Sequence, residues 1–422
     1  MGPDKFLSDG MRILVLSDLH IGPKSRFPGL DGACTDPGKE VNKIASALSA
    51  KNLSCDAVVV PGDLTESADP ALVDSAERFT VRLLEMLQLC DNRLIVVPGN
   101  HDTNWDVQQI DAASIREKIE SEEYSEVEQN HWFQQRYSPW RRANSFSVAE
   151  LTEFPYWHHA IVNDALFLLI NTAAYDGPGV HHHGLIRNTA IDSLNDWLAS
   201  TDIAAEYRIA VFHHHPFLYS DPTGFQRDFS ALQNAEALLD LLGNNRFDIA
   251  IHGHRHIPTF RTNHTDIRPG IHVLGAGSFG VTLPTVYNGL ITNCMHLIEI
   301  DGRDQAGGEA QGKVYTWSYL ESRGWVESGQ SNVLNFITPF GPHYSDGVLK
   351  TRIGQAISES LDRRGWVEWE FLTSLPAYQE FSYLRYERVE RILESLSDRL
   401  QIRWVGESLD RLVILGEQEF EQ

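Results

Sequence analysis

The sequence predicts an α/β fold followed by a small second domain. Apolar runs with strand character alternate with helix-prone segments between residues 11 and 97, which is the order of elements in an α/β protein. Short polar clusters follow these runs, at the strand ends where such proteins gather their functional residues. After a stretch rich in Gly, Ser, Asn and Pro at 328–347, a different pattern of helices and strands begins.

Five elements open the predicted fold. Buried strands are expected at short apolar runs, and helices where apolar residues recur near the helical period. The second helix, for example, carries apolar side chains at Val73, Phe79 and Leu83. In chain order, the expected elements are a strand at 11–17, a helix at 39–51, a strand at 57–60, a helix at 70–89 and a strand at 94–97.

Residues 104–158 interrupt this alternation. The segment 110–128 is acidic and helix-prone, and 130–157 is rich in aromatic residues. We interpret the segment as a helical insertion over the site. Its aromatic side chains either pack the insertion onto the body of the domain or form a lid that selects the substrate, and the sequence leaves both interpretations open.

Strand character returns after the insertion and continues to the end of the first domain, which we place at residues 1–328. A helix is expected at 188–198, and the glycine-rich stretch 301–312 is typical of a hairpin loop. The expected strands lie at 165–171, 207–212, 247–251, 270–274, 296–300 and 313–319.

A linker is expected at 329–346 and a small domain at 347–422. The pattern of this domain predicts the order αβαββ, with a strand at 365–372 and a long amphipathic helix at 378–400. The domain contains no cluster of metal ligands. We therefore expect it to bind a protein partner or a second copy of the chain.

The amino-acid composition disfavours several kinds of partner, site and cellular location. The formal net charge is −23 and no long Lys/Arg run occurs, which disfavours long duplex nucleic acid as a partner. The four cysteines form no CxxC pair, which argues against a disulfide framework or a thiolate zinc site. Neither an apolar run of roughly 20 residues nor a signal-peptide core occurs, so we expect no membrane association and a cytoplasmic location.

Five polar clusters offer carboxylate, amide and imidazole ligands to divalent metals. Two divalent ions about 3.5–4 Å apart can hydrolyse a phosphate ester, because they acidify a bridging water and clamp the phosphate. Asp63 suits the bridging carboxylate, since it follows a strand and a glycine that lets the backbone approach closely. The clusters are Ser17-Asp18-Leu19-His20, Gly62-Asp63, Gly99-Asn100-His101-Asp102, His213-His214-His215-Pro216 and Gly253-His254-Arg255-His256.

Together these clusters resemble the signature of the calcineurin-like metallophosphoesterases, over roughly residues 11–320. The resemblance implies a two-sheet αββα sandwich with the site at the strand ends. It also implies a binuclear metal centre, with manganese as the favoured metal and iron, zinc or nickel as alternatives. One metal would take Asp18, His20, Asp63 and His256, and the other would take Asp63, Asn100, His214 and His254.

The same resemblance gives roles to the residues beside the metals. His101 would hold the phosphate and help the leaving oxygen depart, and Asp102 would orient His101 by a hydrogen bond. Asn100 would also contact the substrate. His183 is expected in a loop near the mouth of the site, and the sequence leaves open whether it only forms part of that loop or also contacts the substrate.

The register of the triple histidine is open. The usual ligand of the family stands two residues before the proline, which selects His214, whereas a slip of one residue selects His213. Asn171 and Asp176 follow another expected strand and are candidates for contacts to the ligands.

The motif details are most similar to those of the cyclic-nucleotide phosphodiesterase branch. This likeness implies a metal-dependent phosphodiesterase that hydrolyses a small nucleotide or cyclic nucleotide by attack of a metal-bridging hydroxide. A nuclease of the double-strand-break-repair type is an alternative, although it needs a basic, aromatic-lined groove that the composition disfavours. A third hypothesis is a partner-docking scaffold that retains a metal core.

Overall fold

The structure is a computed structural model, and it describes most of the chain. Residues 104–155 of the expected insertion lie outside the described residues, and so does His183. The described residues are 10–34, 36–103, 156–174, 176, 184–218, 230–265, 268–284, 287, 290–303, 308–329, 334–341 and 344–416.

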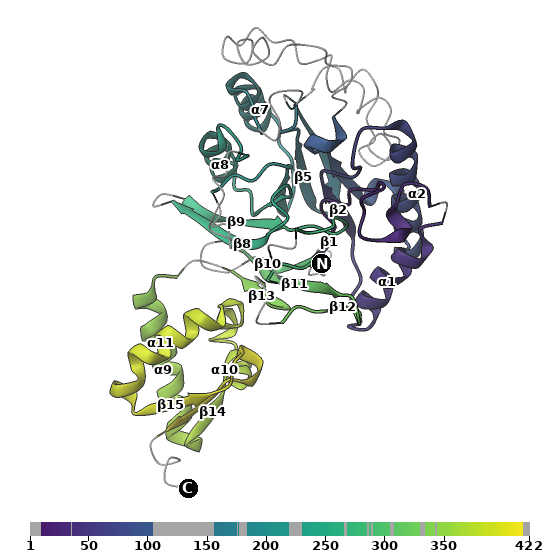
Figure 1. Cartoon of the computed structure of the whole chain (residues 1–422). Coiled ribbons are helices and arrows are strands. Elements are labelled where there is room, and N and C mark those ends of the chain that lie inside the picture. The colour runs from purple at the N-terminus through teal and green to yellow at the C-terminus, as the bar shows by residue number, and fades with distance from the viewer. Residues whose placement is uncertain are drawn as a thin grey trace, which may run out of the picture. The chain divides into compact units, whose positions relative to one another are not determined.

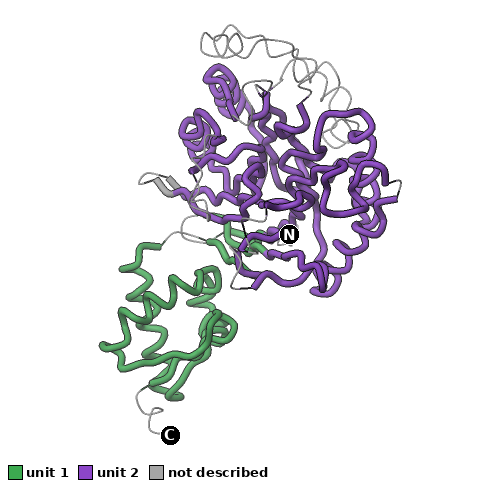
Figure 2. Tube along the Cα trace, viewed as in Figure 1, with its two compact units in different colours: residues 1–10, 300–314, 337–422 green, residues 11–299, 315–336 purple. Residues whose placement is uncertain are grey.

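The chain divides into two compact units (Figure 2). The larger comprises residues 11–299 and 315–336, and the smaller comprises 1–10, 300–314 and 337–422. Each is described by itself below. All the polar clusters named above belong to the larger unit.

The first main sheet has seven strands, in the order β12-β11-β10-β1-β2-β3, with β13 also paired to β11. Strands β1, β2 and β3 are parallel and almost wholly buried. Buried parallel strands read as continuous apolar runs, which is why the sequence predicts these three well. The strands are β1 (Met11–Val15), β2 (Ala57–Pro61), β3 (Leu94–Val97), β10 (Cys294–Arg303), β11 (Ala310–Leu320), β12 (Gly324–Glu327) and β13 (Ile337–Phe340).

Helices α1 (Gly38–Ser49) and α2 (Pro70–Leu87) connect these parallel strands and pack against each other (Figure 1). Helix α2 begins at a proline, which is favourable at the first helical position. The Asp69 side chain caps it by accepting a hydrogen bond of 2.8 Å from the backbone N–H of Ala71. The buried face of α2 includes Val73, Phe79 and Leu83, as the periodicity predicts.

The second main sheet has six strands in the order β4-β5-β6-β7-β9-β8. Strands β5, β6, β7 and β9 are parallel, and β4 and β8 pair antiparallel at the two edges. Helices α7 (Asn188–Ser200) and α8 (Ala235–Asn244) share one hydrophobic core with this sheet. The strands are β4 (Trp157–Val162), β5 (Ala165–Ile170), β6 (Tyr207–Val211), β7 (Ile249–His252), β8 (Pro258–Thr265) and β9 (Arg268–Ala276). The two main sheets and their helices form the expected sandwich.

The C-terminal part of the smaller unit forms the small α/β module that the sequence predicts, with one short helix, α10, added to the expected order αβαββ. Its three strands form an antiparallel sheet of order β14-β16-β15 around a core that contains Trp369, Phe381 and Ile414. The elements are α9 (Asp346–Arg364), β14 (Trp366–Glu368), α10 (Trp369–Ser374), α11 (Tyr386–Leu400), β15 (Ile402–Val405) and β16 (Val413–Gly416).

Some element boundaries differ from the sequence expectations. The strand expected at 365–372 ends at Glu368, where α10 begins, and the helix expected at 378–400 begins only at Tyr386. Leu384 and Arg385 have extended backbone, so the apolar pattern before Tyr386 belongs to a separate 3-10 turn, Gln379–Tyr383. Trp157 and His158, assigned to the insertion, lie in β4, where both are buried.

Within the described part of the chain, no helix is both long and apolar enough to cross a membrane.

Candidate metal centre

The polar clusters come together at one end of the two main sheets. Asp18 and His20 follow β1, Asp63 follows β2, and Asn100 follows β3. The remaining histidines follow β6 and β7 of the second sheet. Backbone hydrogen bonds join these loops: His20 N donates to Asp63 O at 3.0 Å, and Gly253 N donates to His213 O at 3.0 Å. The strand ends therefore place side chains from both sheets around one space.

The backbone of this region is strained. Five residues other than glycine have positive φ, a conformation that costs on the order of 1–3 kcal/mol for each such residue. Such strain persists only where the surrounding structure requires it, and it gathers at functional sites. The residues are Asp18 (51°), His20 (43°), Asp63 (50°), His254 (73°) and His256 (54°).

Two glycines leave room for the site. Gly62 has φ +96°, and a Cβ there would lie 2.4 Å from Nδ1 of His213. A Cβ at Gly99 would lie 2.1 Å from Oδ1 of Asp63. Any larger residue at either position would displace a buried side chain of the site. The site therefore requires glycine at both positions, each directly before a polar residue of the cluster.

The first group of ligand atoms consists of Asp18, His20, Asp63 and His256, whose donor atoms all lie within 4.8 Å of one another. Nε2 of His20 is 3.1 Å from Oδ2 of Asp63. Nε2 of His256 is 3.1 Å from Oδ1 of Asp18. Two carboxylates and two imidazoles suit a borderline divalent cation. This is the set that the sequence assigned to one metal.

The second group consists of Asp63, His213 and His254, again within 4.8 Å of one another. Nδ1 of His254 is 3.2 Å from Nε2 of His213. The amide oxygen Oδ1 of Asn100 lies 3.0 Å from Nε2 of His213 and 2.9 Å from Nδ1 of His254. Asn100 thus adds a fourth donor, its amide oxygen, and Asp63 belongs to both groups.

The structure changes one member of the expected ligand set. The sequence preferred His214, but His213 is the histidine that faces Asp63, with Nε2 at 3.4 Å from Oδ2. His214 contacts other residues: its Nδ1 is 3.0 Å from Oγ1 of Thr172, and its Nε2 is 3.6 Å from Oδ2 of Asp176. Strand β6 ends at Val211, and the chain bends at 213–214, so a spacing counted back from Pro216 does not follow strand alternation.

Asn171 and Asp176, the two other candidates near this site, lie in different surroundings. Asp176 is fully buried and contacts His214, as described above. Oδ1 of Asn171 accepts a hydrogen bond of 3.1 Å from Ala173 N, which closes a local turn after β5.

The buried ionisable groups of the site shift one another's pKa values. Burial alone would raise the pKa of Asp63, but the imidazoles of His213, His101 and His20 hold the pKa well below its ordinary value. Burial alone would lower the pKa of His213, but the carboxylates of Asp63 and Asp18 raise it to about 9. The His213 ring therefore carries a proton when no cation is present. A bound cation would displace that proton, as metal binding to imidazole generally does.

Two further imidazoles of the groups, those of His20 and His254, are neutral. Burial lowers the pKa of His20, and burial together with His214 holds the pKa of His254 well below its ordinary value. A neutral imidazole is the form that ligates a metal. The donor set and its protonation therefore fit two divalent cations that share Asp63.

His101 lies beside the first group, with its ring 4.6 Å from the ring of His20 between centroids. Its Nδ1 is 2.9 Å from the backbone oxygen of Glu66. A carbonyl only accepts, so Nδ1 carries the hydrogen in this bond. The backbone N–H of His101 donates to Oδ1 of Asp63 at 2.9 Å. These two bonds fix the ring against the proposed ligands.

Asp102 has a different task from the expected one. Its buried carboxylate accepts hydrogen bonds from the backbone N–H groups of Gly99, Leu64 and Thr65 and from Oγ1 of Thr65, at 2.9–3.1 Å. It thus ties the loop after β3 to the loop after β2, while the carbonyl of Glu66 orients the His101 ring. Burial and the neighbouring Asp63 raise the pKa of Asp102 to about 6.

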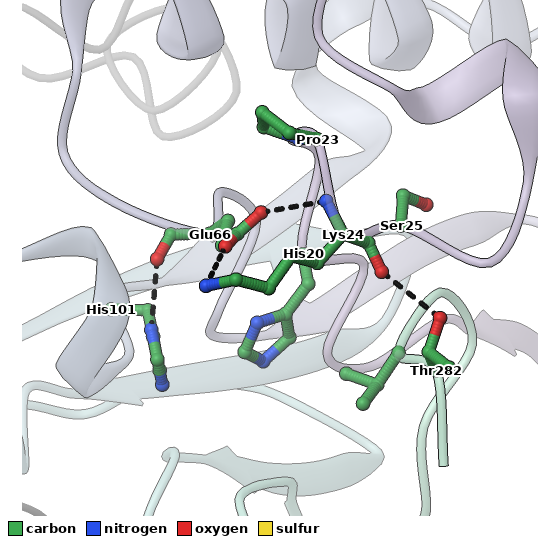
Figure 3. A pocket seen from close by; sticks show the side chains of 8 residues that line it. His20, Pro23, Lys24, Ser25, Glu66, His101 and Thr282 are labelled. Atoms are coloured by element: carbon green, nitrogen blue, oxygen red, sulfur yellow. Dashed lines mark hydrogen bonds and ion pairs between the residues drawn. The ribbon is translucent and has the colours of Figure 1, made fainter.

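A pocket of about 560 Å³ opens beside His101 and His20 (Figure 3). It includes side chains that the sequence did not single out, because they come from loops without a recognisable motif. The lining residues are His20, Pro23, Lys24, Ser25, Glu66, His101, Val281 and Thr282.

Comparison with known proteins identifies a protein family whose model matches this chain. The family model described as calcineurin-like phosphoesterase matches residues 11–258, which is more than half of the chain. No curated protein matches the chain.

Solved structures with a similar fold include three phosphatases or phosphoesterases. A purple acid phosphatase from yellow lupin (Lupinus luteus) seeds is 14% identical, with 75% of this chain and 52% of that chain covered and a TM-score of 0.45. This chain thus spans about half the length of the lupin enzyme. A dimetal phosphatase from Danio rerio is 13% identical (75% and 96% covered, TM-score 0.42). A calcineurin-like phosphoesterase from Bacillus subtilis is 12% identical (72% and 90% covered, TM-score 0.35).

Proposed function

The chain belongs to the calcineurin-like phosphoesterase family, and we propose that it is a metal-dependent phosphodiesterase that acts on a small nucleotide or cyclic nucleotide. The observation that carries this proposal is the position of Asp63. Its carboxylate belongs to both groups of ligand atoms, so one side chain can hold two cations close together.

The chemistry divides between the cations and the residues of this chain. Two divalent cations held here would acidify a water molecule and neutralise the charge that develops on the phosphoryl oxygens. Asp18, His20, Asp63 and His256 would hold one cation, and Asp63, Asn100, His213 and His254 would hold the other. His101 contacts the phosphate and assists the departing oxygen, with its ring oriented by the backbone oxygen of Glu66. Manganese is the cation we favour.

The choice of a small phosphodiester rests on two supports. The details of the motifs are most like those of the cyclic-nucleotide phosphodiesterase branch. The net charge of −23 disfavours long nucleic acid, which weakens the alternative of a double-strand-break-repair type of nuclease.

Hydrolysis of model esters tests the proposal. The purified chain is loaded with manganese, its metal content is measured by elemental analysis, and the hydrolysis of bis-p-nitrophenyl phosphate and p-nitrophenyl phosphate is followed. We expect two metal ions per chain and faster turnover of the diester. A chain with two metals that hydrolyses neither ester would support the scaffold instead. A panel of nucleotides, cyclic nucleotides and single-stranded oligonucleotides then narrows the substrate, and cleavage of the oligonucleotides alone would support the nuclease.

We also propose that the C-terminal module binds a protein partner or a second copy of the chain. Its outer surface exposes apolar side chains, with Trp366 38% exposed and Val405 55% exposed. Both lie on strands of the small sheet. The mass of the full chain in solution, measured with and without the Val405→Glu substitution, tests the second-copy version. A monomer for both proteins at high concentration would leave only the partner version.

A further inference from the structure

An ion pair forms one wall of the pocket beside His101 (Figure 3). Nζ of Lys24 lies 2.6 Å from Oε1 of Glu66. The Lys24 side chain is 86% exposed and the Glu66 side chain is 17% exposed, so the carboxylate is the enclosed partner and the ammonium faces the solvent of the pocket. The two residues are 42 positions apart in the sequence.

Glu66 is held in the pocket by more than this contact. Its Oε2 accepts a hydrogen bond of 2.9 Å from the backbone N–H of Lys24. A Cβ at Gly22 would lie 2.7 Å from Cβ of Glu66, so the glycine leaves the space that the Glu66 side chain fills. Burial alone would raise the pKa of Glu66, but Lys24 holds it below its ordinary value. Glu66 is therefore a carboxylate at neutral pH.

The loop that carries Lys24 is also fixed. Oγ1 of Thr282 donates a hydrogen bond of 3.0 Å to the backbone oxygen of Lys24, and the backbone N–H of Arg26 donates to Gly280 O at 2.8 Å. The backbone oxygen of Glu66 accepts the hydrogen bond from His101. The ion pair is thus attached to His101, the residue proposed to assist the departing oxygen.

The charges of this wall cancel. Apart from the imidazoles of His20 and His101, Lys24 and Glu66 are the lining residues that ionise, and they carry opposite signs. A phosphate monoester carries close to two negative charges at neutral pH, because its second pKa is about 6, whereas a diester carries one. A wall without net charge gives no extra stabilisation to the second charge of a monoester.

We propose that the Lys24–Glu66 pair is a specificity determinant that favours phosphodiesters over phosphomonoesters by keeping this wall of the pocket neutral. The inference rests on the proposed function and names the residues that would decide its substrate class. Glu66 disfavours the second charge, and Lys24 prevents Glu66 from repelling the single charge of a diester.

Three variants test the proposal through the ratio of kcat/KM for p-nitrophenyl phosphate to that for bis-p-nitrophenyl phosphate. Glu66→Gln keeps the shape of the side chain and leaves the wall positive, so the ratio should rise about fivefold to tenfold. Lys24→Met leaves the wall negative, so the ratio should fall by a similar factor. The double variant is neutral again and should return to within about twofold of the original ratio.

The ratio is insensitive to a general loss of activity, because both substrates meet the same variant. Misfolding or metal loss lowers both rates together, whereas the proposal requires shifts of opposite sign in the two single variants. Ratios that stay within about twofold of the unmodified protein in both single variants would overturn it. A manganese-loaded unmodified chain that hydrolyses neither ester would instead refute the proposed function, so the two failures are distinguishable.

Discussion

Asp63 and His213 follow strands of two different sheets, yet Oδ2 of Asp63 lies 3.4 Å from Nε2 of His213. Asp63 follows β2 of the seven-stranded sheet and His213 follows β6 of the six-stranded sheet. A contact between the ends of the two sheets thus completes the second group of ligand atoms. The site depends on how the sheets pack, and each of the following predictions tests one part of it.

Asp63→Asn should remove both metals. The amide keeps the size of the side chain but loses the negative charge that both cations share. We expect less than one metal ion per chain and a fall of kcat/KM for bis-p-nitrophenyl phosphate of at least about a hundredfold. Elemental analysis of the purified variant beside the unmodified protein checks the first part. Two tightly held metals in the variant would be incompatible with a bridging role for Asp63.

The adjacent histidines offer a matched pair of variants. His213→Gln should lose the cation of the second group, because its Nε2 faces Asp63 and His254. His214→Gln should retain two metal ions, because the His214 ring contacts Thr172 and Asp176. Its activity should fall by about tenfold to a hundredfold, the usual effect of removing a residue that supports a ligand. The reverse pattern of metal content would restore His214 as the ligand that the sequence preferred.

These histidines show which features of the site can be predicted from the sequence and which cannot. The strands β1, β2 and β3 are predicted within about two residues, because each is a short, largely apolar run with a polar cluster after it. The residue types of the first ligand group also follow from the sequence, since Asp18 and His20 stand two apart after a strand. The sequence does not determine which of the three adjacent histidines faces Asp63. The reason is that the bend after Val211 depends on contacts such as the 3.1 Å hydrogen bond from His214 N to Oγ1 of Thr172.

Other features needed three-dimensional information for the same reason. The pairing of Lys24 with Glu66 joins two loops, and loops carry no periodicity that would reveal their neighbours. Asp102 bonds to Leu64 and Thr65 of another loop, so the partner that the family resemblance implied, His101, is not the one that its carboxylate contacts. Helix α8, by contrast, has a recognisable signal in the sequence, since Leu238, Leu239 and Leu242 recur at helical spacing and are buried.

His101→Ala should separate turnover from metal binding. His101 contacts the first ligand group through its backbone N–H, which donates to Asp63, and this bond survives the substitution. The loss of the ring should reduce kcat for bis-p-nitrophenyl phosphate by about a hundredfold, the usual effect of losing a general acid, while two metal ions remain. Single-turnover kinetics together with elemental analysis measure both quantities. A variant that has lost its metals would show that His101 supports the ligands instead.

His296 predicts a pH dependence of stability away from the metal centre. Its buried ring has Nε2 2.9 Å from Ala276 O and Nδ1 2.9 Å from Oγ1 of Thr316. Because a carbonyl only accepts, Nε2 donates to Ala276 O and Nδ1 accepts from the Thr316 hydroxyl. The bond from the Thr316 hydroxyl needs the neutral ring, because a proton on Nδ1 removes the acceptor. Burial lowers the pKa of His296 to about 4 from an ordinary value of 6.5.

The direction in which the free energy of unfolding changes with pH follows from proton uptake by the unfolded chain. Between pH 6.5 and pH 4 the unfolded chain binds a proton at His296 that the folded chain does not bind, so the free energy of unfolding falls as the pH falls. The contribution of this group is fully present above pH 6.5, and about 3 kcal/mol of it is lost by pH 4. In His296→Gln, the amide can still donate to Ala276 O but takes up no proton. Urea denaturation at several pH values should therefore show a shallower decline in the variant than in the unmodified protein, and parallel curves would mean that His296 does not resist protonation.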